Sequence, residues 1–224
     1  MVQENISDKL KNLKSQSLSK VVEEQLEQMI ISGELQPGER INESALSNLL
    51  QISRAPIREA CRQLSQYGMV ENRVGKGSYV REVNLQNAVE LYEIRGALDA
   101  LAVELVCQRI SNEEVNELKN LVDQMRKFAE DEASTEYFST NLKFHQMIVR
   151  LSRNEALIEL YEVVFRKLSL FRQKTLAQPS RLQASLAQHE GILRAIVNRD
   201  EKLAVKLARS HVEEAKVVLL IEKQ

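Results

Sequence analysis

The sequence predicts a mainly α protein, with a small N-terminal part of helices and one hairpin and a larger C-terminal part made only of helices. The 224 residues include seven glycines and three prolines, too few for the many turns of an all-β fold. Apolar residues recur at helical spacing through most of the chain. The glycines and prolines typical of turns are concentrated before residue 82, whereas residues 85–222 hold one proline and two glycines. These observations place two different architectures in one chain.

Composition narrows the classes of protein that the chain can be. Hydrophobic residues make up 43% and charged residues 28%, which argues against a mainly disordered chain. The formal net charge is −1, so a site for nucleic acid has to come from local clustering of cations. No apolar run approaches the ~18 residues of a spanning helix, and no signal peptide is evident. The two cysteines form no CxxC pair and are typical of buried thiols. We expect a cytoplasmic protein with no membrane partner.

The N-terminal part is predicted to contain three helices. They are expected over residues 15–32, 43–50 and 54–67. Gly33 and Gly68 follow the first and third helices at the position where glycine commonly ends a helix. Ser53 is a suitable N-cap for the third helix, and Pro56 lies in its first turn, where a missing N–H is harmless.

A β-hairpin is predicted to follow these helices. Met69–Arg73 and Ser78–Arg81 are short and strand-like, and Val74-Gly75-Lys76-Gly77 lies between them. A glycine-rich link between two such runs is typical of a hairpin turn.

The C-terminal part is predicted to be a bundle of six helices. They are expected over residues 86–108, 112–130, 134–152, 155–176, 180–198 and 200–222. Ser111 with Glu114 forms a capping-box pattern, and Asp200 is a suitable N-cap. The predicted domains are a flexible N-terminus at 1–14, a first domain at 15–81, a linker at 82–85 and a second domain at 86–224.

Positive charge is concentrated in one short stretch. Residues 52–81 hold six cations and two anions, a local charge of +4. Arg54, Arg58 and Arg62 recur every four residues and therefore share one face of the third helix. The first turns of such a helix can reach base edges in the major groove, and Lys76 at a glycine-rich tip can approach phosphates. The alternative is that these charges form an ordinary solvated helix face with no ligand. The order of helices followed by a hairpin, which is typical of a DNA-binding unit, argues against that alternative.

Three segments of this region resemble the winged helix-turn-helix of GntR-family transcription regulators. They are Gly33-Glu34-Leu35-Gln36-Pro37-Gly38-Glu39-Arg40-Ile41-Asn42-Glu43, Ile52-Ser53-Arg54-Ala55-Pro56-Ile57-Arg58-Glu59-Ala60 and Gly75-Lys76-Gly77-Ser78-Tyr79-Val80. The resemblance implies that Arg54 and Arg58 read bases, that Ser53 contacts the DNA backbone and that Gly75 approaches the minor groove. Ser44 stands where the fatty-acid-responsive member has an arginine, so no base contact is expected there. The predicted DNA-binding set is Ser53, Arg54, Ala55, Pro56, Arg58, Arg62, Gly75 and Lys76.

All three histidines of the chain lie in the second domain, each on an apolar helix face. Burial of His145, His189 and His211 requires a partner for each imidazole. A shared Zn, Ni, Cu or Fe ion would satisfy all three, whereas separate hydrogen bonds are the alternative. Asn141, one turn before His145, could add an oxygen ligand. Ser185, one turn before His189, could bind a water molecule or an effector.

Arg95 also lies on an apolar face and needs an anion if it is buried. Asp99, one turn later, is the structural partner, and the carboxylate or phosphonate of an effector is the functional one. Arg172 is a weaker candidate of the same kind.

The second domain resembles the FCD effector domain of the FadR subfamily. The segments concerned are Tyr92-Glu93-Ile94-Arg95-Gly96-Ala97-Leu98-Asp99, Asn141-Leu142-Lys143-Phe144-His145, Gln188-His189-Glu190-Gly191-Ile192 and His211. The resemblance implies an antiparallel six-helix bundle that holds a divalent metal through an aspartate and three histidines beside a small-carboxylate pocket. Asn141 stands at the usual aspartate position, and a neutral amide is a poorer ligand. The segments at 141–145 and 170–172 also resemble regulators associated with phosphonate utilisation, which implies an organophosphonate effector.

The predicted function is a homodimeric DNA-binding transcriptional regulator, a repressor, that is not an enzyme. A small anionic metabolite, bound beside a divalent Zn, Ni, Fe or Mn ion, is expected to control its binding to a double-stranded operator. A metal-dependent enzyme is the first alternative, but no carboxylate lies within one turn of His145 on its inner face to act as a general base. A purely architectural DNA-binding protein is the second alternative, which the inward Arg95 and the histidines disfavour.

Overall fold

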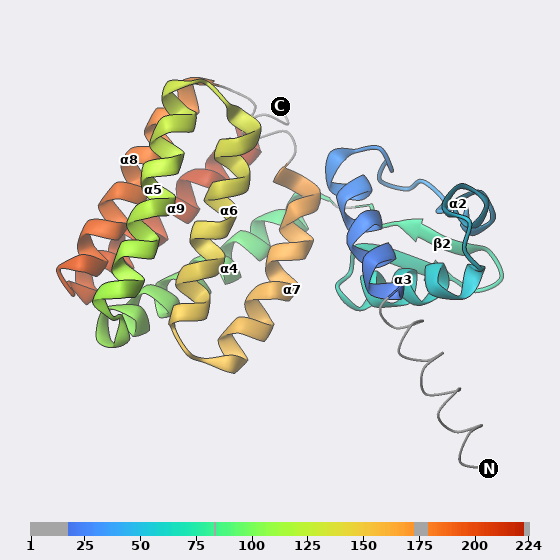
Figure 1. Ribbon diagram of the computed structural model, residues 1–224, viewed down its shortest axis with the longest axis horizontal. Helices are drawn as coiled ribbons and strands as arrows, with labels where there is room; N and C mark the ends of the chain where they lie inside the picture. The colour runs from blue at the N-terminus through green and yellow to red at the C-terminus, as the bar shows by residue number, and fades with distance from the viewer. Residues whose placement is uncertain (1–17, 83, 173–178, 222–224) are drawn as a thin grey trace, which may run out of the picture. The chain divides into compact units, whose positions relative to one another are not determined.

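The computed structural model describes residues 18–82, 84–172 and 179–221, and the chain divides into two compact units, residues 1–83 and 84–224. Figure 1 shows a mixed N-terminal unit and a C-terminal unit made of helices. The prediction of a mainly helical fold with a winged helix-turn-helix followed by a helical domain is confirmed.

The N-terminal unit has the predicted order of helices and hairpin. After helical residues 18–32 come α2 (Glu43–Leu50), α3 (Arg54–Gln66), β1 (Val70–Arg73) and β2 (Gly77–Val80). The strands pair antiparallel, with Val70 opposite Val80. An isolated bridge between Arg40 and Tyr79 ties the segment before α2 to the hairpin. The hairpin is therefore held beside the start of α2.

The core of this unit is mainly aliphatic, and aromatic residues make up only 4% of the chain. Ile57 and Leu64 of α3 are fully buried, and Leu26 of the first helix is 1% exposed. Two apolar residues of the first helix, Leu18 and Val21, are 36% and 59% exposed. The buried face of that helix is narrower than its spacing of apolar residues predicts.

The C-terminal unit contains six described helices. They are α4 (Leu85–Arg109), α5 (Asn112–Glu130), α6 (Ser134–Leu151), α7 (Glu155–Arg172), α8 (Pro179–Val197) and α9 (Glu201–Ile221). Helix α4 packs against α6, α7, α8 and α9, whereas α5 packs against α6 and α8. The Ser111–Glu114 capping box forms, and Asp200 accepts a hydrogen bond from the N–H of Leu203. Residues 173–176 of the predicted fourth helix lie outside the described residues.

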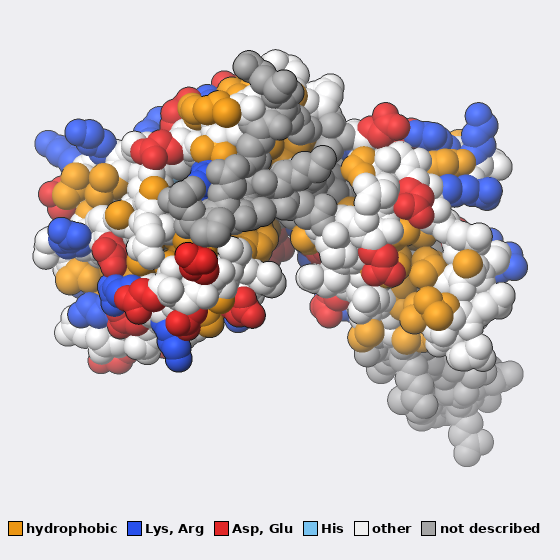
Figure 2. All heavy atoms as spheres, turned by 90° about the horizontal axis from the view of Figure 1, so that it is seen from above, with side chains coloured by type: hydrophobic (Ala, Val, Ile, Leu, Met, Phe, Trp, Pro, Cys, Tyr) orange, Lys and Arg blue, Asp and Glu red, His pale blue; other side chains and the backbone are white. Residues whose placement is uncertain are grey.

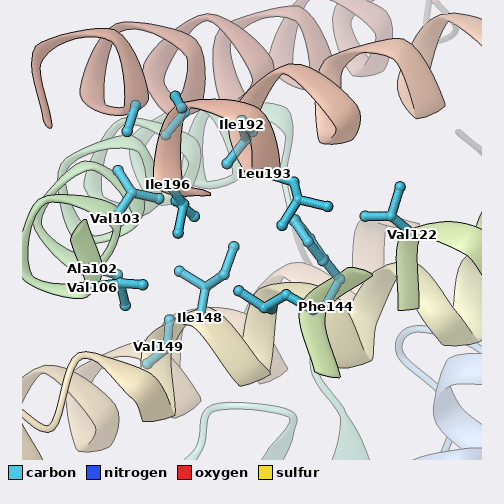
Figure 3. Packing of buried hydrophobic residues seen from close by; sticks show 14 of the residues in the cluster. Ala102, Val103, Val106, Val122, Phe144, Ile148, Val149, Ile192, Leu193 and Ile196 are labelled. Carbon is cyan, nitrogen blue, oxygen red and sulfur yellow. The ribbon is translucent and has the colours of Figure 1, made fainter. Parts of the chain in front are cut away.

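Aliphatic side chains from four helices meet in the interior of this unit. Figure 3 shows Val103 and Val106 of α4, Val122 of α5, Ile148 of α6 and Ile196 of α8 in one cluster. Phe144 of α6 is fully buried there, and its ring lies edge-on to His189, with ring centroids 5.2 Å apart. The packed core therefore extends up to the histidines and fixes the ring of His189 from one side.

The carboxyl end of α4 is capped by arginines from the ends of two other helices. Arg199 donates to the carbonyl oxygens of Cys107 and Ile110 at 3.0 and 2.7 Å, and Arg153 donates to that of Arg109 at 2.9 Å. Both arginines have a left-handed backbone, with φ of 52° and 53°. Local sequence patterns do not predict these contacts, which join residues about 40 to 90 positions apart.

Charge is mixed over the surface of the C-terminal unit. Figure 2 shows acidic and basic side chains interspersed on the face that it presents. Among the described helices, none is both long enough and apolar enough to span a membrane.

Candidate functional site

Helix α3 divides its side chains between an exposed basic face and a buried apolar one. Arg54, Arg58 and Arg62 are exposed, as their spacing predicts. Ile57, Cys61 and Leu64 are at most 1% exposed on the opposite side. The basic face of α3 is therefore on the surface of the N-terminal unit.

The residues at the start of α3 differ in how accessible they are. Ser53 is the exposed N-cap residue, and its hydroxyl makes no capping bond, so it is able to donate to a phosphate. Ala55 is exposed as well. Pro56 is buried, so little of its ring is open to DNA, and its place in the predicted set stays a prediction. Its ring packs inward because it lies on the core side of the first turn.

Two arginines of the basic face are paired with carboxylates. Nε of Arg58 lies 2.7 Å from Oε2 of Glu43 at the start of α2. Arg62 contacts Glu59 with both Nε and Nη2, at 2.9 and 2.5 Å. Hydrogen bonds from Arg62 and Gln63 lower the pKa of Glu59 to about 2. Glu43 was not predicted as part of this surface, because the contact depends on how α2 crosses α3.

A hollow of about 350 Å³ lies between α2, α3 and the hairpin. Three arginines line it: Arg40, Arg54 and Arg58. Arg40 was missed, since it lies outside the basic stretch at 52–81 and reaches this surface through its bridge to Tyr79. A cluster of three guanidinium groups in a concave surface is suited to a polyanion.

The tip of the hairpin is open. Gly75 has φ of +70°, and a side chain added there would meet nothing within 4 Å. Lys76 is exposed beside it, and its backbone N–H closes the turn to the carbonyl of Arg73 at 3.0 Å. Nothing lies against Gly75 within 4 Å, so this unit leaves the tip open to a groove or a phosphate.

The structure brings the three histidines together from three helices. Nε2 of His145 on α6 lies 3.2 Å from Nε2 of His189 on α8 and 3.2 Å from Nε2 of His211 on α9. Their exposed fractions are 5%, 0% and 8%. The ring nitrogens that could act as ligands lie within 4.8 Å of one another.

Hydrogen bonds at the far side of two rings fix which nitrogen carries the proton. Nδ1 of His189 lies 2.6 Å from the carbonyl oxygen of Ser185, which can only accept. Nδ1 of His211 lies 2.7 Å from Oε1 of Gln188. Each Nδ1 therefore donates, so Nε2 is the nitrogen left to bind a ligand, and in both rings it faces His145. Burial lowers the pKa of His189 to about 4, against the opposing effect of the Ser185 hydrogen bond, so the ring stays neutral at pH 7.

This arrangement fits a bound metal ion. Nitrogen ligands that lie about 2.0–2.1 Å from one zinc ion are themselves about 3 Å apart, close to the spacing of these Nε2 atoms. Converging lone pairs repel one another unless a cation or a proton lies between them. The carbonyl and amide acceptors behind His189 and His211 are the outer partners that metal-binding histidines commonly have.

A cavity of about 160 Å³ adjoins the histidines. Its lining includes Arg95, Asn141, Arg181, Ser185, His211 and Glu214. The hydroxyl of Ser185 is 3.5 Å from Nδ1 of His189. Asn141 is 8% exposed, and its buried Oδ1 has no hydrogen-bond partner. The cavity therefore joins the predicted metal site to two of the predicted effector residues, Arg95 and Ser185.

Arg95 and Arg172 have different outcomes. Nε of Arg95 donates to Oδ2 of Asp99 at 3.1 Å, so the structural partner is present, while Arg95 also lines the cavity. Burial works against the charge of Arg95, but Asp99 and Tyr161 raise its pKa above the ordinary value. Arg172 ends α7, and its side chain lies outside the described residues.

Comparison with known proteins gives two family matches that together span most of the chain. Residues 18–80 match the model of bacterial regulatory proteins of the gntR family, and residues 90–214 match the FCD domain. The HTH-type transcriptional regulator YdhC of Bacillus subtilis is 31% identical over 84% of both chains. The Nta operon transcriptional regulator of Aminobacter aminovorans is 31% identical over 83% of this chain and 86% of its own. The solved structure of Escherichia coli McbR/YncC has the same fold, with a TM-score of 0.79 and 21% identity over 92% of this chain and 99% of that one.

Proposed function

Because the chain belongs to the bacterial GntR regulatory proteins and carries an FCD domain, we propose that it is a homodimeric repressor whose operator binding is controlled by a small anionic metabolite held beside a divalent metal. The chain is a transcriptional regulator, and its family and relatives are regulators rather than enzymes. The proposed domains are 15–81 for DNA and 86–224 for the effector, joined at 82–85. The proposed place of action is the cytoplasm.

The exposed start of α3 carries the DNA-binding part of the proposal. Arg54 and Arg58 stand on the accessible face of a helix that follows a helix and a turn, where a recognition helix presents its base-reading residues. Arginine can bond the O6 and N7 atoms of guanine with both arms of its guanidinium. The other proposed DNA contacts are Ser53 at the DNA backbone, Gly75 at the minor groove, Lys76 at a phosphate, and Ala55, Pro56 and Arg62 beside them.

Substitution of Arg58 tests this assignment. The duplex is an operator selected from a random pool by the wild-type protein. Arg58→Ala should weaken binding to it by ~1–3 kcal/mol and relax the preference at the base pair that Arg58 reads. Arg194→Ala, an exposed arginine of α8, is the control and should bind as the wild type does. Unchanged operator affinity in the Arg58 variant would remove it from the recognition set.

The histidine trio carries the metal part of the proposal. His145, His189 and His211 would hold the ion, because one nitrogen of each ring lies within 4.8 Å of the others. Asn141, whose buried Oδ1 lacks a hydrogen-bond partner and which lines the same cavity as His211, would be an oxygen donor. A bound Zn, Ni, Fe or Mn ion would supply positive charge that fixes an anion in the cavity. Arg95, Ser185 and Arg172 are the proposed effector contacts from the protein.

Elemental analysis tests the metal directly. Untagged protein purified without chelator should contain about one metal ion per chain, and His189→Ala should lose it. Arg126→Ala, which changes an exposed ion pair on α5 and α8, is a control that should keep the metal. A wild-type chain that takes up no zinc or nickel after incubation would contradict a metal-assisted pocket.

Repression and dimerisation rest on different support. One relative, 27% identical and from Paenarthrobacter nicotinovorans, carries the name "Probable D-xylose utilization operon transcriptional repressor". Helix-turn-helix regulators read two half-sites with two-fold symmetry, so a dimer is the expected state. Effector binding would shift the population between forms that differ in DNA affinity. Reporter expression from the selected operator should rise when the gene for this protein is deleted.

A further inference from the structure

Asn141 places a buried, neutral amide in the lining of the cavity beside the histidines. The side chain is 92% buried, and its Oδ1 has no hydrogen-bond partner. It stands one helical turn from His145 on α6 and lines the same cavity as His211 and Arg95. A buried amide oxygen without a donor is unfavourable unless a cation or a ligand donor approaches it. The amide is also neutral, unlike an aspartate, which would occupy nearly the same volume.

The ionisable groups of the cavity cancel one another. Among the described residues, Arg95 and Arg181 in the lining are cations, and Glu214 in the lining is an anion. Asp99, which pairs with Arg95, is the second anion. A histidine ring that holds a metal ion through a nitrogen lone pair is neutral, so the three imidazoles add no charge to the loaded site. The protein alone therefore contributes no net charge to this region, and a divalent ion among the histidines would leave it with two uncompensated positive charges.

We infer that the cavity takes a compact dianion, such as a dicarboxylate or a phosphonate, in preference to a monocarboxylate. This inference rests on the proposed metal site. A dianion would neutralise the loaded site, whereas a monoanion would leave one positive charge uncompensated beside the buried Arg95. With aspartate at position 141 the loaded site would carry one positive charge, and a monoanion would be enough.

The dimensions of the cavity agree with a small ligand. Its volume of about 160 Å³ is well below the ~300–1,000 Å³ of pockets for larger organic molecules. Ser185 and Gln188 add a hydroxyl and an amide to the lining. These neutral groups can bond the outer oxygens of an anion without changing the charge balance.

Matched probes separate charge from shape. Succinate and malonate are dianions at pH 7.5, and their half-amides, succinamate and malonamate, have nearly the same shape with one charge fewer. Zinc content is measured first in the full-length wild type, in Asn141→Asp and in Asn141→Ala. Binding of the four probes to each zinc-loaded protein is then measured by titration calorimetry, with melting temperature as a second readout.

We expect a dianion to bind the zinc-loaded wild-type protein at least about tenfold more tightly than its half-amide does. Asn141→Asp should lower that ratio by about tenfold and bind zinc more tightly. Asn141→Ala, which removes the oxygen but keeps the charge, should retain the preference for the dianion. This variant also separates the effect of charge from that of a lost ligand atom.

Several results would overturn the inference. Equal binding of a dianion and its half-amide to wild type would do so, as would an unchanged ratio in a folded Asn141→Asp protein. A zinc-loaded wild type that binds neither dianion at 10 mM would also overturn it. If wild type takes up no zinc, the metal site of the proposed function fails first, and the preference for a dianion fails with it.

Discussion

Gln188 holds His211 through a hydrogen bond of 2.7 Å between its amide oxygen and Nδ1 of the imidazole. The amide nitrogen of Gln188 donates to the carboxylate of Glu214, which can only accept, so the orientation of the amide is fixed. Gln188→Leu should lower zinc affinity by about 10- to 100-fold, because His211 loses the partner that sets its tautomer. Competition with a chromophoric chelator measures the change. Gln183→Leu on the same helix should leave zinc affinity as it is, and equal losses in both variants would rule out this role.

The buried ion pair of Arg95 and Asp99 should matter for stability more than any exposed pair. Both side chains are 6% exposed. Asp99→Asn keeps the shape but leaves the guanidinium without its anion, and should lower the free energy of unfolding by about 3–5 kcal/mol in metal-free protein. Asp123→Asn, whose partner Arg126 is at the surface, should cost under about 1 kcal/mol. Urea denaturation measures both, and similar losses would contradict the assigned difference in burial.

Cysteine reactivity should be very low in the folded protein. Burial raises the pKa of Cys61 to about 11, and the carboxylate of Glu43 adds to the effect while Ser78 opposes it. At pH 8 the thiolate would be about 0.1% of the population, against about 10% for a thiol of pKa 9. Reaction with a disulfide reagent should therefore be slow at pH 8, accelerate toward pH 10 and become fast in guanidinium. Rapid labelling of native Cys61 at pH 8 would contradict its burial.

Lys76 at the hairpin tip should act through phosphate rather than through bases. Lys76→Ala should reduce the slope of log K against log salt by about one and weaken binding to all duplexes alike. Arg58→Ala should instead change the ratio between operator and unrelated DNA. Salt titrations of DNA binding distinguish the two, with Lys202→Ala as a control in the other unit. A loss of sequence preference in the Lys76 variant would show that the tip reads bases.

Local periodicity explains what the sequence could predict. The fourfold spacing of Arg54, Arg58 and Arg62 and the apolar neighbours of each histidine depend only on helix geometry. Helix α2 has the predicted bounds, since Asn42 caps it and Gln51 ends it in a left-handed conformation. Residue type and spacing along a single helix were therefore enough to predict the basic face of α3 and the inward direction of the histidines.

Contacts between helices explain what the sequence could not predict. The pair of Glu43 and Arg58 joins residues 15 positions apart and depends on the crossing of α2 and α3. The inward direction of Arg95 was predictable, but its choice between Asp99 and an effector was not, because both partners suit a guanidinium. Burial of Pro56 was hidden for the same reason: its position in the first turn of α3 does not reveal which side of that turn faces the core.

The left-handed arginine at the end of α8 reverses a common rule of thermostabilisation. Replacing a non-glycine residue of positive φ by glycine normally removes strain of about 1 kcal/mol. Glu132, exposed and with φ of 54°, should follow that rule and raise the melting temperature as Glu132→Gly. Arg199→Gly should lower it, because two carbonyl groups of α4 would lose a charged donor. Arg199 keeps a strained left-handed backbone, and its side chain in return joins the end of α8 to the end of α4. The residue whose backbone suggests a stabilising substitution is therefore one on which the fold depends.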